Sequence, residues 1–233
     1  MRERLCFFAI AAVAVLVCAC GGGNSAPQSV TKSASPTPRP VSQIDLPNMV
    51  ITSADLAAPY SAFVLDPATS GQQTRDSVIN NACDPKRQAA ELDATNWVAQ
   101  YDNEFGLAEG ASAASDGTFL IGSGVDLFQD ASGAAAAFQG MITETLQWAN
   151  TECNGLNIGV VQKFDVPTIG DESWGSDANF TTLSGNRTLS GVVTTVISRR
   201  GQVVVYESIA YFGNTGLADE AIRLTKLVVQ RMS

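Results

Sequence analysis

Apolar and polar residues alternate with a period of two in the second half of the chain. In the first such run, Trp97, Ala99, Tyr101 and Phe105 fall on one side, and Gln100, Asp102 and Glu104 on the other. This alternation is typical of a half-buried antiparallel strand. Further strands are predicted over residues 119–128, 158–166, 173–183, 189–199 and 202–212, with Arg200-Gly201 as the hairpin between the last two.

Two segments switch to a helical period. After Asp130, a good N-cap residue, apolar side chains recur every three or four residues at Phe138, Ile142, Leu146 and Ala149. The second segment has acidic residues in its first turn and an apolar face that runs from Leu217 to Val228. Residues 74–81 and 85–92 also have helical composition.

These elements predict an α+β fold with a mainly antiparallel sheet and the two long helices packed on one face. Both halves of the chain run from strands into a helix. This shared order suggests a duplicated ββα-type unit, although no repeat of individual residues is visible.

The N-terminus has the pattern of a bacterial lipoprotein signal. Arg2 and Arg4 precede an apolar run from Cys6 to Val17, and Val17-Cys18-Ala19-Cys20 resembles a lipobox. The run is too short for a spanning helix, which needs about 20 apolar residues. We therefore expect residues 1–19 to be a signal peptide and Cys20 to carry the lipid, because the small Ala19 precedes it.

Three regions are expected in total. Residues 20–43 hold the lipidated cysteine and a spacer rich in Gly, Ser and Pro, and residues 44–233 form one extracytoplasmic domain. Beyond the signal and Cys20, the cysteines are Cys83 and Cys153. In an exported protein we expect them to form a disulfide, which would stabilise the fold by roughly 4 kcal/mol; two free buried thiols are the alternative.

Charge and composition exclude several functions. The formal net charge of −9 argues against nucleic acid as a partner. The chain has no histidine, the most common general base, and lacks the spacing of known catalytic and nucleotide-binding motifs. Asp171-Glu172 alone is weak support for a calcium site. We expect no enzyme activity, no cofactor and no bound metal.

Aromatic and acidic residues in the strands are the candidate ligand-binding set. Such side chains together would suit a sugar, a cation or an apolar ligand with a polar end, although strand aromatics are more often core residues. The set comprises Trp97, Tyr101, Glu104, Asp171, Glu172, Trp174, Tyr206, Glu207 and Tyr211. Glu207 lies in a strongly apolar run, so we expect it to pair with Arg199 or Arg187, or else to face a pocket with a raised pKa.

Several short motifs resemble one family. They are Asp126-Leu127-Phe128 before an alanine-rich helix with Ala137-Phe138, the segment from Val166 to Glu172, and the segment from Arg199 to Val205 before an amphipathic C-terminal helix. Together they resemble the extracytoplasmic sensor-like domains of bacterial surface lipoproteins and of some membrane serine/threonine kinases. The resemblance covers about residues 95–232 and implies an antiparallel sheet with helices and a cleft.

The favoured function is a lipid-anchored, non-catalytic binding or sensor module on the extracytoplasmic face of the cell membrane. Its partners would be the membrane, through the anchor, and a small molecule, a lipid or an envelope protein. The alternatives are a carrier of an apolar ligand, a hydrolase that pairs Glu207 with Glu104 or Glu172, and a structural envelope protein.

Overall fold

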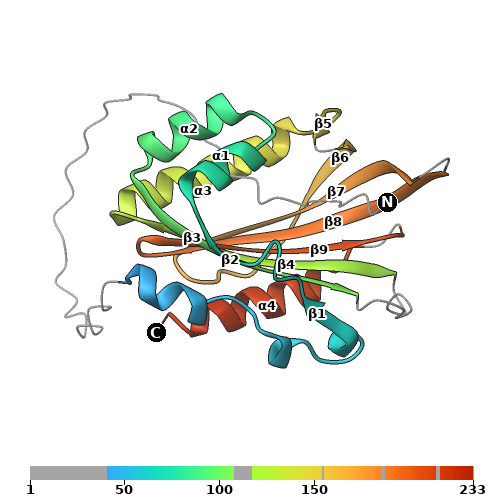
Figure 1. Ribbon diagram of the computed structural model, residues 1–233, viewed down its shortest axis with the longest axis horizontal. Coiled ribbons are helices and arrows are strands. Elements are labelled where there is room, and N and C mark those ends of the chain that lie inside the picture. The colour runs from blue at the N-terminus through green and yellow to red at the C-terminus, as the bar shows by residue number, and fades with distance from the viewer. Residues whose placement is uncertain (1–40, 108–116, 154, 185–186, 214–215, 233) are drawn as a thin grey trace, which may run out of the picture.

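The computed structural model describes residues 41–107, 117–153, 155–184, 187–213 and 216–232. They form an α+β fold around one nine-stranded sheet of order β1-β3-β4-β9-β8-β7-β6-β5, with β2 also paired to β3 (Figure 1). Every pairing between these strands is antiparallel. The predicted fold class and sheet type are confirmed.

The strands follow the alternating runs of the sequence. The long ones are β3 (Trp97–Leu107), β4 (Thr118–Phe128), β6 (Leu156–Phe164), β7 (Glu172–Ser184), β8 (Arg187–Arg200) and β9 (Val203–Tyr211), and the short ones are β1 (Phe63–Leu65), β2 (Gly71–Gln73) and β5 (Glu152–Cys153). Gly201 takes a positive φ of 59° in the hairpin between β8 and β9. A left-handed residue suits this tight turn, and glycine adopts it without a steric cost.

Polar capping residues precede the first three α-helices, whereas Leu217 takes the N-cap position of the fourth. The helices are α1 (Arg75–Asn81), α2 (Pro85–Ala94), α3 (Ala131–Gln147) and α4 (Ala218–Gln230), and three 3-10 segments lie nearer the N-terminus: η1 (Gln43–Asn48), η2 (Ser53–Asp55) and η3 (Tyr60–Ala62). Asp130 accepts a hydrogen bond from the Gly133 amide at 2.8 Å, as its place before α3 predicts. Asp84 caps α2 and Thr74 caps α1 in the same way.

The prediction that both long helices pack on one face is wrong. Figure 1 shows α3 on one side of the sheet with α1 and α2, and α4 on the other side with the η segments. The sequence of β9 explains this arrangement, because Val204 and Tyr206 pack in the cluster with α3, and Val203 and Val205 pack in the cluster with α4. A strand that is apolar on both faces needs a layer on each side. We call these sides the α3 face and the α4 face.

The two ββα units are not a repeat. Strands β4 and β9 are antiparallel neighbours at the centre of the sheet, with β3 and β8 on their outer sides. A rotation that superimposes the two hairpins would leave α3 and α4 on opposite faces. The units therefore have opposite hand, and the shared order of elements does not reflect a structural duplication.

Some predictions fall on residues that the structure does not describe. The signal peptide, Cys20 and most of the spacer lie outside the described residues, so these assignments stay predictions. The Cys83 sulfur is disulfide-bonded. The Cys153 side chain is outside the described part, and the Cys83–Cys153 pairing also stays a prediction. Within the described ranges, each helix is too short or too polar to cross a bilayer.

Candidate functional site

The predicted ligand-binding residues do not gather in one place. Strand alternation puts Glu104, Trp174 and Tyr206 on the α3 face, and Tyr101, Glu207 and Tyr211 on the α4 face. Trp97 lies on the opposite face from Ala99, because a bulge between these two residues shifts the register of β3. The expectation that Trp97 shares a face with Ala99, Tyr101 and Phe105 is therefore wrong.

Asp171 and Glu172 belong to a structural turn. Arg199 forms ion pairs with Asp171 at 3.0 Å and with Glu172 at 3.4 Å. The Asp171 carboxylate also accepts a hydrogen bond from the Gly201 amide at 2.8 Å. These contacts join the start of β7 to the β8–β9 hairpin. Within the described residues, no group of three or more acidic or cysteine side chains is placed to hold a metal ion.

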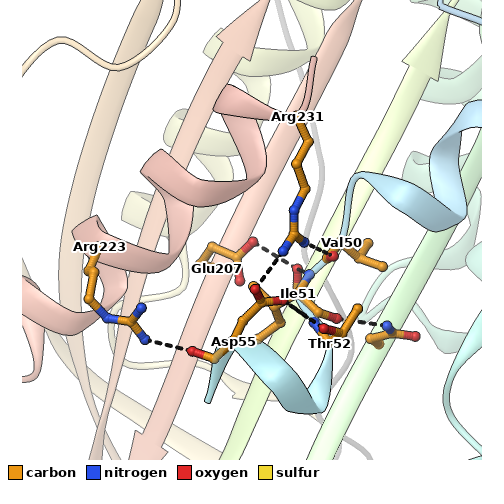
Figure 2. Close-up of polar contacts among 9 residues, drawn as sticks. Val50, Ile51, Thr52, Asp55, Glu207, Arg223 and Arg231 are labelled. Carbon is orange, nitrogen blue, oxygen red and sulfur yellow. Dashed lines mark hydrogen bonds and ion pairs between the residues drawn. The ribbon is translucent and has the colours of Figure 1, made fainter. Parts of the chain in front are cut away.

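Glu207 is fully buried on the α4 face, where it helps to hold the N-terminal segment, residues 41–62, against the sheet (Figure 2). Its Oε1 accepts a hydrogen bond from Ser123 Oγ at 2.8 Å, and Ser123 Oγ accepts one from the Ile51 amide at 3.0 Å. Asn103 Nδ2 donates to the Ile51 carbonyl at 2.8 Å. Asn103, Ser123 and Glu207 are register partners on three adjacent strands. The expected pairing of Glu207 with Arg199 is wrong, because Arg199 pairs with Asp171 and Glu172, and the side chain of Arg187 lies outside the described part of the chain.

Arg223 in α4 and Arg231 directly after it also form hydrogen bonds with the N-terminal segment. Figure 2 shows Arg231 directed at Val50 and Asp55, with distances of 2.5 Å to the Val50 carbonyl and 2.5 Å to the Asp55 carboxylate. Arg223 donates to the Asp55 carbonyl at 3.1 Å. Burial alone would raise the pKa of Asp55, but hydrogen bonds from Arg231 and Thr52 lower it. Burial raises the pKa of Glu207 well above its usual value, which favours the neutral form of its carboxyl group.

The carboxylate pairs proposed for a hydrolase do not exist. Glu207 faces the N-terminal segment on the α4 face, whereas Glu104 and Glu172 lie on the α3 face. The sheet separates Glu207 from both, and two acids that act on one substrate must flank the same bond.

On the α3 face, a polar cluster spans β3, β4 and β9. The Tyr206 hydroxyl donates to Asp102 and accepts a hydrogen bond from Gln100 Nε2, the latter at 2.8 Å. Trp97 Nε1 donates to Asp126 Oδ1 at 2.8 Å. The alternation predicts Gln100 and Asp102 on a polar strand face, but not in a site. It does not reveal that Gln100 and Asp126 are buried and that Asp102 is half-buried.

These carboxyl groups have raised pKa values. Burial raises the pKa of Asp126 to about 8, and the hydrogen bond from Trp97, which lowers this pKa, only partly offsets the rise. Burial also raises the pKa of Asp102 to about 6 and of Glu104 to about 7, and for Glu104 the charges of Asp66 and Asp102 add to the effect. The charged groups that act on these three acids are other carboxylates.

Gly124 allows the cluster to form, which gives a first prediction. A Cβ at position 124 would lie 1.9 Å from Tyr206 Cζ, whereas a Cβ at Gly122 meets nothing within 4 Å. We expect Gly124→Ala to displace the Tyr206 ring, break its hydrogen bonds and lower the free energy of unfolding by about 2 kcal/mol. Gly122→Ala on the same strand and face should change it by less than about 1 kcal/mol. Urea denaturation of both variants measures the difference, and equal losses would contradict it.

Beyond Tyr206, a row of small and polar residues crosses five strands of the α3 face. Paired in register, the row is Glu104, Gly122, Ser208, Thr195 and Ser176, and we call it the central strip. All but Ser176 are half-buried. The Thr195 and Ser208 hydroxyls lie 3.1 Å apart. The next row is also small or aliphatic and includes Gly106, where an added Cβ would again meet nothing within 4 Å.

An aromatic cluster borders the strip at the ends of β4 and β9. Phe119 and Phe212 stack with ring centroids 4.3 Å apart and an interplanar angle of 18°. Phe180 lies 6.2 Å from Phe119 and 6.3 Å from Phe212. Phe119 and Phe212 are half-buried. Sequence reasoning missed this cluster and the strip, since single strands with alternate Gly, Ser and Thr residues also fit a solvated face.

The α3 face thus combines hydroxyl groups, carboxyl groups and half-buried aromatic rings. The sheet holds them on adjacent strands, so their spacing is fixed by backbone hydrogen bonds. Such a surface can bind a ligand through hydrogen bonds and apolar contact.

Comparison with known proteins gives a fold relationship. No protein-family model matches the chain, and no curated protein is similar to it. The extracellular domain of PknH from Mycobacterium tuberculosis has a similar structure, with a TM-score of 0.53 and 14% identity over 84% of this chain and 100% of that chain. The predicted resemblance to the extracytoplasmic domain of a membrane serine/threonine kinase is therefore confirmed for the fold. PA94 of Pseudomonas aeruginosa, a protein of unknown function, matches at a TM-score of 0.30 and 17% identity over 50% of this chain and 72% of that chain.

Proposed function

We propose that this protein is a non-catalytic, sensor-like module that binds a small ligand on its α3 face. The lipid anchor at Cys20 would hold it on the extracytoplasmic side of the cell membrane. The fold shared with an extracellular kinase domain and the lipoprotein pattern of the N-terminus support this location. The spacer before Val41 would let the domain stand away from the bilayer.

The main support for the proposal is the chemistry of the central strip. Its hydroxyl groups, its half-buried glycine and the adjoining rings offer a surface where a ligand can make hydrogen bonds and apolar contacts without displacing the core. The α4 face is different, because α4 and the N-terminal segment cover it and Leu46, Val50 and Ile51 are fully buried there. A half-exposed strip favours a ligand held at the surface over a lipid carried inside the protein.

Native mass spectrometry of the purified full chain tests the proposal. We expect the folded mass to exceed the denatured mass by a discrete amount, because a ligand stays bound through purification. Gly122→Leu, which fills the strip with a side chain, should lose this extra mass. Gly122→Ala is the matched control and should retain it. Equal folded and denatured masses would contradict tight binding, and retention by Gly122→Leu would exclude the strip as its site.

A further inference from the structure

Asp102 and Glu104 form an acidic end of the central strip, and no positively charged group of the described residues is among those that act on either carboxyl group. Asp102 and Glu104 are half-buried neighbours on the α3 face of β3. Three arginines on this side of the sheet whose side chains the structure describes are held in ion pairs of their own: Arg75 with Asp93 at 2.7 Å, Arg87 with Glu91 at 3.0 Å, and Arg199 with Asp171 at 3.0 Å. Lys163, the register partner of Ser176, is exposed at the opposite end of the row. A positive charge brought by a ligand would complement Asp102 and Glu104.

The other border of the strip is aromatic. Phe119 is three residues from Gly122 along β4, a separation of about 10 Å at the usual rise of a strand. Between these points this face of β4 and β9 carries Leu120 and Ala210, and a Cβ added at Gly106 or Gly122 would meet nothing within 4 Å. The face therefore offers a charged end, a flat middle and an apolar end.

We infer that the central strip binds an organic cation, with its ammonium group beside Asp102 and Glu104 and an apolar or aromatic group against Phe119 and Phe212. This inference rests on the proposed function and names the class of ligand. The ammonium group would gain from the two carboxylates, and a slender chain about 10 Å long would pass over Gly122 and Leu120 to reach the rings. The stacked rings can also attract part of the positive charge.

Titration calorimetry with three probes of one length tests the charge preference. The probes are phenylpentyltrimethylammonium, phenylpentylsulfonate and phenylpentanol. The purified full chain is used at pH 8, above the pKa of about 7 that burial and the neighbouring Asp66 and Asp102 give Glu104. We expect the ammonium probe to bind at least tenfold more tightly than the sulfonate or the alcohol.

Variants locate the binding. Glu104→Gln keeps the size of the side chain and removes its charge. It should therefore lower the affinity for the ammonium probe at least fivefold and change the affinity for the alcohol little. Gly122→Leu should lower the affinity for all three probes. Asp165→Asn removes an exposed carboxylate in the loop after β6 and should leave every affinity unchanged.

The outcomes separate this inference from the proposed function. Equal affinities for the ammonium and sulfonate probes, or an unchanged ammonium affinity in Glu104→Gln, would overturn the cation preference. If the alcohol or the sulfonate then still binds and Gly122→Leu abolishes it, the strip remains a binding face for another class of ligand. If no probe binds while a ligand co-purifies, the ligand class is wrong and the proposed function stands. If no probe binds and no ligand co-purifies, the cation preference and the proposed function are both wrong.

Discussion

Raising the pH from 5 to 7 is expected to destabilise this protein, the reverse of the usual acid denaturation of proteins with paired carboxylates. Three buried acids on different elements carry the effect: Asp126 on β4, Glu144 on α3 and Glu207 on β9. Burial raises the pKa of Asp126 to about 8 and of Glu144 to about 7, and Arg87 only partly opposes the latter. Burial also raises the pKa of Glu207.

The sign follows from linkage between protonation and folding. Below about pH 3 each of these acids is almost fully protonated in the folded and the unfolded chain, and folding is not penalised. As the pH rises, the unfolded chain loses its protons first, and this ionisation favours unfolding. The loss of stability continues until the folded group also ionises, which for Asp126 is near pH 8. Asp55 and Asp130 have lowered pKa values and act in the opposite sense at lower pH.

The variant Asp126→Asn measures one part of this effect. Its amide oxygen can still accept the hydrogen bond from Trp97, but it does not ionise. A group that is charged only in the unfolded chain changes the free energy of unfolding by about 1.4 kcal/mol per pH unit. The variant should therefore reduce the difference in stability between pH 5 and pH 7 by about 2–3 kcal/mol.

Urea denaturation at both pH values supplies the test. Asp165→Asn, at an exposed loop position, should leave the pH dependence of the wild type unchanged. A wild-type protein that is more stable at pH 7 than at pH 5 would contradict the prediction. An unchanged pH dependence in Asp126→Asn would mean that Asp126 is ionised in the folded state at both pH values.

The strands could be predicted from the sequence because their signal is local. Alternation places β3, β4 and β6–β9 within a few residues of where they lie, and Asp130 marks the start of α3. The layers could not be predicted so well, because the side of the sheet that a helix covers depends on contacts between distant residues. The apolar run from Val203 to Tyr206 was the available signal for a strand buried on both faces.

The sites show the same division between local and distant information. Trp97 changes face through one bulge, which alternation cannot reveal. The central strip arises because Gly122, Ser208 and Thr195 come into register from three strands. None of these residues is unusual in its own strand. Glu207 did stand out in its apolar run, but its partners Ser123 and Ile51 are far away in sequence, and a search for a nearby arginine could not find them.

Replacement of Glu207 by alanine is expected to lower the free energy of unfolding by about 3–4 kcal/mol. The change leaves a cavity at a fully buried position and deprives the Ser123 hydroxyl of its acceptor. Because Ser123 also accepts the Ile51 amide, the N-terminal segment that continues from the spacer would be held less firmly. Denaturation in urea measures the loss, and limited proteolysis should cut residues 41–62 faster than in the wild type.

Glu207→Gln decides which property of the side chain matters. A neutral Glu207 is close in shape and hydrogen bonding to glutamine, so this variant should lose less than about 1 kcal/mol and keep the wild-type rate of proteolysis. An ionised Glu207 would instead interact with Arg231, whose charge acts on it from the end of α4. Glutamine would then be nearly as harmful as alanine, because it would leave Arg231 without that interaction. A large loss in Glu207→Gln would thus show that an ion pair, and not a neutral hydrogen-bonded network, holds the segment against the sheet.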